Sequence, residues 1–186
     1  MLNKSKVYII DFDDSFTYNI ANILYPLVPD IEVINYKLFF EIDMERITFN
    51  NKMGIILGPG PGHPNQYSAY FDKIKYLLYK PNIYLMGICL GHQLVAIQLG
   101  YKIITSAHPA HGEKIHFLWK DKECCVQRYN SLAVQPKYQT SELIWQNEVM
   151  ILSYQNGQSF QFHPESVGTE NPMYFFKDLV EYLHSS

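Results

Sequence analysis

Apolar residues gather in short runs, bounded by turn residues, along the first half of the chain. Four of these runs are typical of buried strands, and they cover residues 6–11, 31–36, 53–58 and 83–88. Between them, apolar side chains recur at helical spacing, which predicts helices over residues 15–24, 67–79 and 90–99. Strands that alternate with helices favour a parallel sheet whose crossover connections are right-handed.

The pattern changes in the second half, where shorter strand-like runs and turns occupy residues 102–162. Several of these runs are typical of antiparallel strands, and QNGQ at residues 155–158 is a hairpin turn signal. A last amphipathic helix is predicted over about residues 172–183. The expected fold class is therefore α/β: an open, mostly parallel twisted sheet with helices on both faces and a small antiparallel extension. No repeat or linker divides the chain, so a single domain is expected over residues 1–186.

Composition narrows the possible function classes. With 186 residues, 47% of them hydrophobic, the chain can bury a core of ordinary size. Its net charge is −3 and no basic run stands out, which argues against nucleic acid as a partner. No apolar stretch approaches the roughly 20 residues that span a bilayer, so no membrane association is expected, and a secretion signal is not evident. The three cysteines form no disulfide framework, so a reduced, cytoplasmic location is expected.

A cysteine stands between two glycines in GICLGHQL, residues 87–94, where a predicted strand ends and a helix begins. Functional atoms gather at this edge of parallel sheets, and Gly-x-Cys-x-Gly has the form of a nucleophile elbow. Gly87 and Gly91 would leave room for the tight turn, while the helix N-terminus would stabilise a thiolate at Cys89. A buried, inert thiol is the alternative, and this motif alone leaves both interpretations open.

His163 and Glu165 can supply the base that a reactive thiol needs. They lie two residues apart in QFHPES, at the end of a strand-like run, so their side chains point to the same side. Glu165 can then accept one ring N–H of His163 and leave the other nitrogen facing the thiol, as in a nucleophile–base–acid triad. A His-Pro turn with a solvated glutamate is the simpler interpretation of this segment alone, but the elbow favours the triad.

The rigid LGPGPGHP loop at residues 57–64 is a third candidate element. It follows the third predicted strand, so it is expected at the same sheet edge as Cys89. Its backbone can present an N–H to an oxyanion, beside the N–H of Leu90. The stretch lacks the lysine and hydroxyl residue of a P-loop, so a phosphate site is not favoured. A plain turn without a ligand is the remaining alternative.

Together these motifs resemble the class I (triad) glutamine amidotransferases, in particular the glutaminase subunits of anthranilate synthase and aminodeoxychorismate (para-aminobenzoate) synthase. The resemblance starts at DFDDSFTYNI and continues in order through GICLGHQ, RYNSL and QFHPES, over nearly the whole chain. It implies a flavodoxin-like α/β fold, hydrolysis of L-glutamine to glutamate and ammonia, no metal and no cofactor. It also implies a partner, a chorismate-using synthase subunit that receives the ammonia within a hetero-oligomer.

The resemblance further implies roles for individual residues. Cys89 would be the nucleophile, His163 the base and Glu165 its orienting acid. The implied oxyanion hole consists of the N–H groups of Gly60 and Leu90. The implied substrate-binding residues are Gly60, Pro61, Gly62, Gln93, Ser131 and Leu132.

The chain departs from the family pattern at Gly58, Asn130 and the Glu113-Lys114 pair. These departures leave open which partner it serves, and whether it belongs to tryptophan or to folate synthesis. Two other functions also stay open: a stand-alone thiol hydrolase of γ-glutamyl compounds, and a non-catalytic binding or regulatory module of the same fold.

Two further groups of polar residues have simpler explanations. Asp14 or Ser15 is expected to cap the first helix. His108 and His111 have no evident third ligand nearby, so a place in a loop or an interface is expected rather than a metal site.

Overall fold

The computed structural model describes residues 5–42 and 52–185, which form a central seven-stranded sheet. The strands of this sheet are β1 (Lys6–Asp11), β2 (Asp30–Asn35), β3 (Met53–Leu57), β4 (Ile83–Ile88), β9 (Glu142–Trp145), β10 (Glu148–Tyr154) and β11 (Gly157–Phe160). Their order is β2-β1-β3-β4-β11-β10-β9. The strands from β2 to β11 run parallel, and β10 and β9 extend the sheet antiparallel at one edge. The prediction of a mostly parallel sheet is confirmed.

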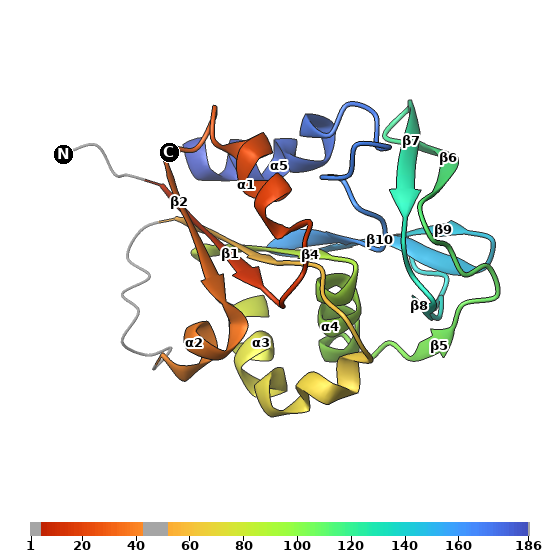
Figure 1. The fold of residues 1–186 in the computed structure, drawn as a ribbon, viewed down its shortest axis with the longest axis horizontal. Coiled ribbons are helices and arrows are strands. Elements are labelled where there is room, and N and C mark those ends of the chain that lie inside the picture. The colour runs from red at the N-terminus through yellow and green to blue at the C-terminus, as the bar shows by residue number, and fades with distance from the viewer. Residues whose placement is uncertain (1–4, 43–51, 186) are drawn as a thin grey trace.

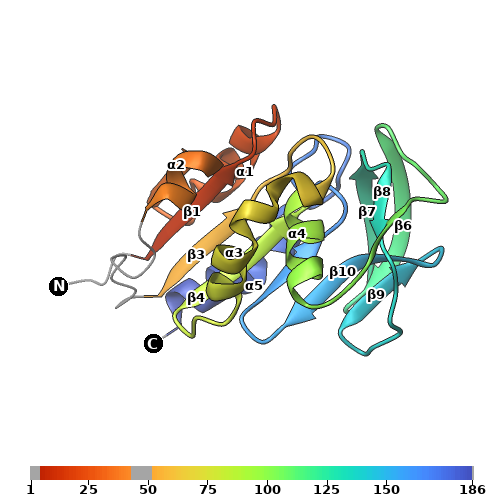
Figure 2. The ribbon, with the colours of Figure 1, turned by 90° about the horizontal axis from the view of Figure 1, so that it is seen from below.

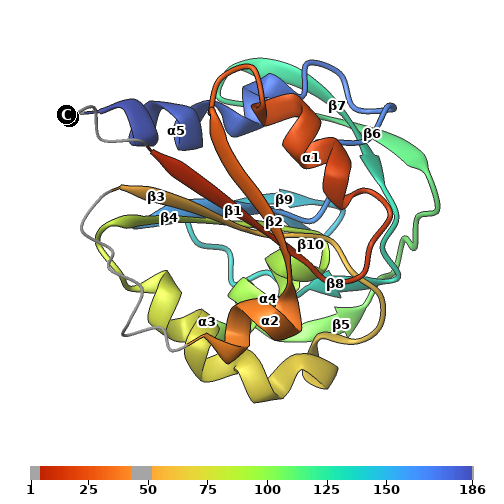
Figure 3. The same ribbon diagram turned by 60° about the vertical axis from the view of Figure 1, so that its left-hand side comes forward.

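Helices cover both faces of the sheet, as expected. They are α1 (Thr17–Leu24), α2 (Tyr36–Glu41), α3 (Phe71–Leu78), α4 (Leu90–Gln98) and α5 (Met173–His184). Helices α1 and α5 lie on one face, and α2, α3 and α4 lie on the other (Figure 1, Figure 3). Every residue of β3 and β4 is buried, because a strand with both faces covered has no solvated side. Among the described residues, no helix combines the length and apolar character that a membrane crossing needs.

The strands of the first half begin and end within one residue of their predicted bounds. The single helix predicted over residues 67–79 is instead two elements, the 3₁₀ helix η1 (Pro64–Tyr70) followed by α3, which begins only at Phe71. A capping box starts η1: His63 accepts the N–H of Asn65, and the Gln66 side chain accepts the N–H of His63. Helix α2 was not predicted, since its six residues contain too few apolar repeats to reveal a helical period.

The predicted cap of α1 by Asp14 or Ser15 is wrong. The helix begins at Thr17 with Phe16 at the N-cap position, and no side-chain hydrogen bond caps it in the described structure. Asp13 adopts a left-handed conformation, with φ 63°. The Asp14 carboxylate accepts the N–H of Phe16 (2.8 Å), which precedes the first residue of the helix.

Two small antiparallel sheets form the expected extension, and they lie at the end of the molecule far from α2 (Figure 2). They pair β5 (Ile103–Thr105) with β8 (Leu132–Val134), and β6 (Glu113–Trp119) with β7 (Lys122–Arg128). The predicted hairpin at residues 155–158 is confirmed, since it joins β10 to β11 and pairs Tyr154 with Gly157. Because β11 runs parallel to β4, the loop after Phe160 emerges beside the end of β4. This pairing determines where the candidate site lies.

Candidate functional site

Cys89 lies at the sharp turn between β4 and α4. Its backbone has φ 51° and ψ −102°, a conformation rare for residues with a side chain, which costs about 1–3 kcal/mol. A Cβ at Gly91 would lie 2.0 Å from the carbonyl oxygen of Leu57, and one at Gly87 would lie 2.6 Å from the backbone of Gly91. Only glycine fits at these two positions. The N–H of Cys89 donates to the carbonyl of Phe160 (2.8 Å), which ties the elbow to β11.

A buried histidine, His92, anchors the first turn of α4. Its Nε2–H donates to the carbonyl of Val149 (3.2 Å), and its Nδ1 accepts the hydroxyl of Ser159 (2.9 Å). Burial lowers the pKa of His92 to about 3, so the ring is neutral at physiological pH. These two contacts hold the helix behind Cys89 against β10 and β11.

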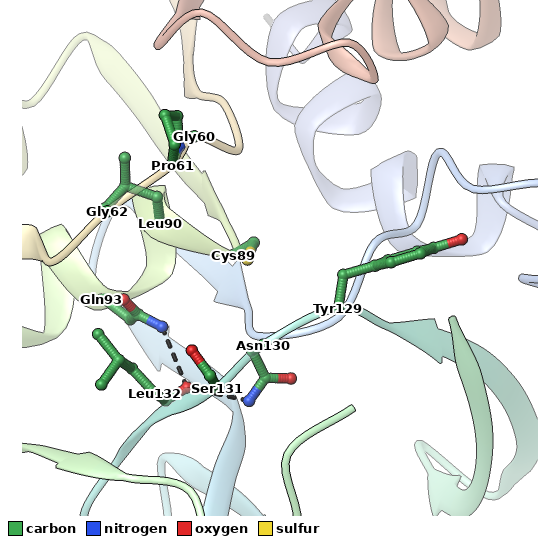
Figure 4. Close-up of a pocket in the computed structure, with 10 residues that line it drawn as sticks. All are labelled: Gly60, Pro61, Gly62, Cys89, Leu90, Gln93, Tyr129, Asn130, Ser131 and Leu132. Carbon is green, nitrogen blue, oxygen red and sulfur yellow. Dashed lines mark hydrogen bonds between the residues drawn. The ribbon is translucent and has the colours of Figure 1, made fainter. Parts of the chain in front are cut away.

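A cavity of about 170 Å³ lies beside Cys89 (Figure 4). It is lined by Gly60, Pro61, Gly62, Cys89, Leu90, Gln93, Tyr129, Asn130, Ser131 and Leu132. This lining includes every residue that was predicted to bind substrate. The volume is well below the roughly 300 Å³ at which pockets for drug-sized ligands begin, so the space suits a molecule of amino-acid size.

Gly60 and Leu90 are the lining residues whose backbone N–H groups were expected to form an oxyanion hole. Leu90 is the first residue of α4, so no carbonyl one helical turn earlier accepts its N–H. Gly60 packs directly on the side chain of Leu90, since a Cβ at position 60 would lie 2.6 Å from that side chain. Within residues 5–42 and 52–185, neither N–H donates to a backbone carbonyl. Donors without a backbone acceptor are one condition that an oxyanion hole has to meet.

The segment of residues 129–132 forms another wall of the cavity. Gln93 reaches it from α4, where its Nε2 donates to the carbonyl of Leu132 (3.2 Å; Figure 4). The Asn130 side chain donates to the same carbonyl (2.9 Å) and accepts from Nε of Arg128 (3.0 Å). The side chain of Asn130 therefore holds this backbone in place. One of the three departures from the family pattern thus has a structural role.

A buried ion pair lies behind this wall. Arg128 donates to Glu148 at 3.1 Å, and the two side chains are only 1% and 2% exposed. The second oxygen of Glu148 accepts from the hydroxyl of Ser106 (2.6 Å) and the N–H of Ala107 (3.0 Å). Arg128 also donates to the carbonyl of His108 (3.1 Å). Burial lowers the pKa of Arg128, and the charge of Glu148 opposes this shift.

His163 and Glu165 form a hydrogen-bonded pair in the loop after β11. Nδ1–H of His163 donates to Oε1 of Glu165 at 2.7 Å, since a carboxylate can only accept. Burial acts to lower the pKa of His163, but Cys89 and Glu165 outweigh this effect and raise the pKa well above its usual value. The other nitrogen, Nε2, is buried and has no hydrogen-bond partner in the described part of the chain. That nitrogen is thus not occupied by another hydrogen bond in that part of the chain, and Cys89 is the group whose sulfur raises the pKa of the ring.

Three residues around this pair were not predicted. The Gln161 amide donates to the sulfur of Cys89 (3.9 Å) and accepts from Gln93 (3.2 Å). Since Gln161 precedes His163 by two residues, strand alternation was a signal that could have revealed it. The rings of Phe16 and Tyr129 flank the imidazole, with centroids 5.4 Å and 5.1 Å away. No local pattern in the sequence marks these two rings.

The other candidate histidines pack against aromatic rings. His108 lies 6.0 Å from the ring of Trp145, and His111 lies 6.2 Å from the ring of Tyr129. Nowhere in the part of the chain that the structure describes do three or more His, Cys, Asp or Glu side chains gather in a way that could hold a metal ion.

Comparison with solved structures supports the fold. A putative GMP synthase component from Thermoplasma acidophilum superimposes with a TM-score of 0.79 at 16% identity, over 98% of this chain and 96% of that one. A glutamine amidotransferase from Thermotoga maritima gives a TM-score of 0.67 at 19% identity, over 96% and 84% of the two chains. At these identities the likeness shows a shared fold.

Sequence relatives reach higher identities. Anthranilate synthase component 2 of Saccharolobus solfataricus is 34% identical, over 87% of this chain and 90% of its own length. That of Cyanophora paradoxa is 32% identical, over 96% of this chain and all of its own length. The bifunctional protein TrpGD of Thermotoga maritima is 30% identical over 94% of this chain, which spans only 32% of that relative. The family model for class-I glutamine amidotransferases matches residues 8–182, and this chain therefore belongs to that family.

Proposed function

We propose that this chain hydrolyses L-glutamine through a Cys89–His163–Glu165 triad and delivers the ammonia to a chorismate-using synthase subunit. The observation that carries the proposal is the position of Cys89. It occupies a strained elbow beside a cavity of amino-acid size, and its sulfur raises the pKa of a buried histidine that Glu165 orients. The relatives named anthranilate synthase component 2 favour anthranilate over 4-amino-4-deoxychorismate as the final product.

The chemistry is a two-step acyl transfer. The Cys89 thiolate attacks the side-chain carboxamide carbon of glutamine, and the resulting oxyanion is stabilised by the N–H groups of Gly60 and Leu90. His163 gives its Nε2 proton to the departing nitrogen, so ammonia leaves and a γ-glutamyl thioester remains. Water then attacks the thioester while His163 takes up its proton, which yields glutamate and regenerates the Cys89 thiolate beside a protonated His163.

The rest of the cavity is assigned to substrate recognition. Gln93 is proposed to contact the amide end of glutamine from α4. The segment that holds Ser131 and Leu132 is proposed to bind the α-amino and α-carboxylate groups, mainly through its backbone. Asn130 fixes that backbone through its bond to the Leu132 carbonyl, which limits the ordering cost when substrate binds.

The proposal is tested by measuring glutamate and ammonia release from L-glutamine, with and without chorismate and a chorismate-using synthase subunit. We expect glutamine hydrolysis, its stimulation by the synthase, and anthranilate as the aromatic product. Faster turnover of γ-glutamyl peptides than of glutamine, without any partner effect, would instead establish a stand-alone thiol hydrolase. A chain that never reacts with a glutamine-analogue alkylating agent, even beside the synthase, would be a non-catalytic module.

Replacing Glu165 with glutamine is expected to lower kcat for glutamine hydrolysis by about 10²- to 10⁴-fold. The carboxylate helps to raise the pKa of His163, so its loss lowers that pKa and the imidazolium form disappears at a lower pH than in the wild type. NMR titration of the His163 ring measures this shift directly. A variant with an unchanged His163 pKa would show that Glu165 does not orient the base.

A further inference from the structure

The loop that carries His163 and Glu165 has little regular structure of its own. Residues 161–170 form turns and bends, apart from a single bridge that pairs His163 with Gln127 of β7. In that bridge the N–H of His163 donates to the carbonyl of Gln127 (2.9 Å). The position of both side chains therefore depends on specific contacts between this loop and its neighbours.

The side chain of Gln127 makes two of these contacts and a third to another loop. Its Oε1 accepts the N–H of Gly168 (3.0 Å) and the hydroxyl of Ser166. Its Nε2 donates to the carbonyl of Gly112 (2.7 Å), in the loop before β6. The side-chain amide of Gln127 thus connects β7 to the loop that follows Glu165 and to the loop that contains Gly112.

The loop is shaped to receive this amide. A Cβ at Gly168 would lie 2.3 Å from Oε1 of Gln127, so any other residue there would displace the amide from this position. Thr169 adds a second connection: the N–H of Gln127 donates to its hydroxyl oxygen (3.0 Å), and that hydroxyl donates to the carbonyl of His163 (2.7 Å). The two ends of the segment that contains Glu165 are therefore both linked to Gln127.

We propose that Gln127 is a positioning residue for the reaction, one that holds the His163–Glu165 pair at the distance the thiol requires. This inference rests on the proposed glutaminase function. Gln127 is not among the residues that line the cavity beside Cys89, so it acts through the loop and not on the substrate. Its amide oxygen is the acting group, because that atom makes both side-chain contacts to the loop.

The test is Gln127→Met, which keeps the length of the side chain and removes its polar atoms. We expect kcat for glutamine hydrolysis to fall about 10- to 100-fold, because small displacements of catalytic groups have effects of this size, while KM changes by less than about threefold. A looser Glu165 contact should also lower the His163 pKa, as measured by NMR titration. Gln98→Met is the matched control, since the Nε2 of that half-buried glutamine has no partner within the described residues.

Two more variants separate positioning from general stability. Gln127→Glu retains an acceptor for Ser166 and Gly168 and loses the donor to the Gly112 carbonyl, so its kcat is expected to exceed that of Gln127→Met by at least about threefold. If Gln127→Met fails to fold, Ser166→Ala removes only one contact and is expected to lower kcat about threefold at unchanged KM.

The inference is overturned if both the His163 pKa and kcat are unchanged in Gln127→Met. Where Gln127→Met does not fold, the same result in Ser166→Ala overturns it. So does a Gln127→Glu variant as slow as Gln127→Met. A wild type that never hydrolyses glutamine refutes the proposed function instead, and the titration still tests the loop.

Discussion

Replacing Cys89 with alanine is expected to lower glutamine hydrolysis by at least about 10⁴-fold, because Cys89 supplies the one thiol among the described residues that line the cavity. The fold should survive the change. Alanine removes only the sulfur atom. Gly87 and Gly91, which make room for the tight turn, are unchanged in this variant. The measurement is steady-state glutamate release by variant and wild type, each assayed beside the synthase subunit.

The other cysteines provide a matched control for this experiment. Cys125 is 5% exposed on β7 and does not line the cavity, so Cys125→Ala is expected to retain wild-type kcat. Burial raises the pKa of the Cys125 thiol, which makes it slow to react with a glutamine-analogue alkylating agent. Mass spectrometry should therefore find the label on Cys89 alone. Turnover of the Cys89→Ala variant above a tenth of the wild-type rate would refute the assigned nucleophile. Such a loss corresponds to less than about 1.4 kcal/mol of activation free energy, which is too little for the removal of the attacking atom.

The parts of the fold that the sequence revealed are those with local signals. Short apolar runs located β1 to β4 closely, and the Asn-Gly pair located the hairpin between β10 and β11. Strand pairing is different, because it joins residues distant in sequence. Nothing near residue 157 indicates that β11 lies parallel to β4, yet this pairing brings the loop of His163 to Cys89. The short β8 and β9 were not predicted either, since three or four residues hold too little alternation.

The candidate site divides in the same way. Gly87, Cys89 and Gly91 form a compact motif, because the elbow imposes its steric demand on adjacent residues. The contacts of Gln127 were not predictable, since its partners come from two loops that only the tertiary structure brings together. The buried charges behind the cavity wall were hidden for a similar reason. Arg128 and Glu148 are 20 residues apart, and each resembles an ordinary surface charge in the sequence.

This buried pair leads to the second large effect, on stability. Glu148→Ala would leave the Arg128 guanidinium without its counter-ion and remove the acceptor of Ser106 and Ala107. A lone buried charge of this kind costs about 3–5 kcal/mol, a large part of the roughly 5–15 kcal/mol that stabilises a typical domain. Urea unfolding should show this loss as a lower midpoint. KM for glutamine should rise as well, because Arg128 also holds Asn130 and through it the cavity wall.

The double variant Arg128→Met/Glu148→Leu separates charge burial from simple loss of contacts. With both charges gone, no uncompensated ion remains, and apolar side chains of similar size fill the space. Its free energy of unfolding should therefore exceed that of Glu148→Ala by about 2 kcal/mol or more, although more side-chain contacts have been removed. If the double variant is instead less stable than Glu148→Ala, the hydrogen bonds of the pair stabilise the fold more than burial of its charges costs. KM should rise further in the double variant than in Glu148→Ala, since methionine at position 128 also removes the bond from Arg128 that orients Asn130.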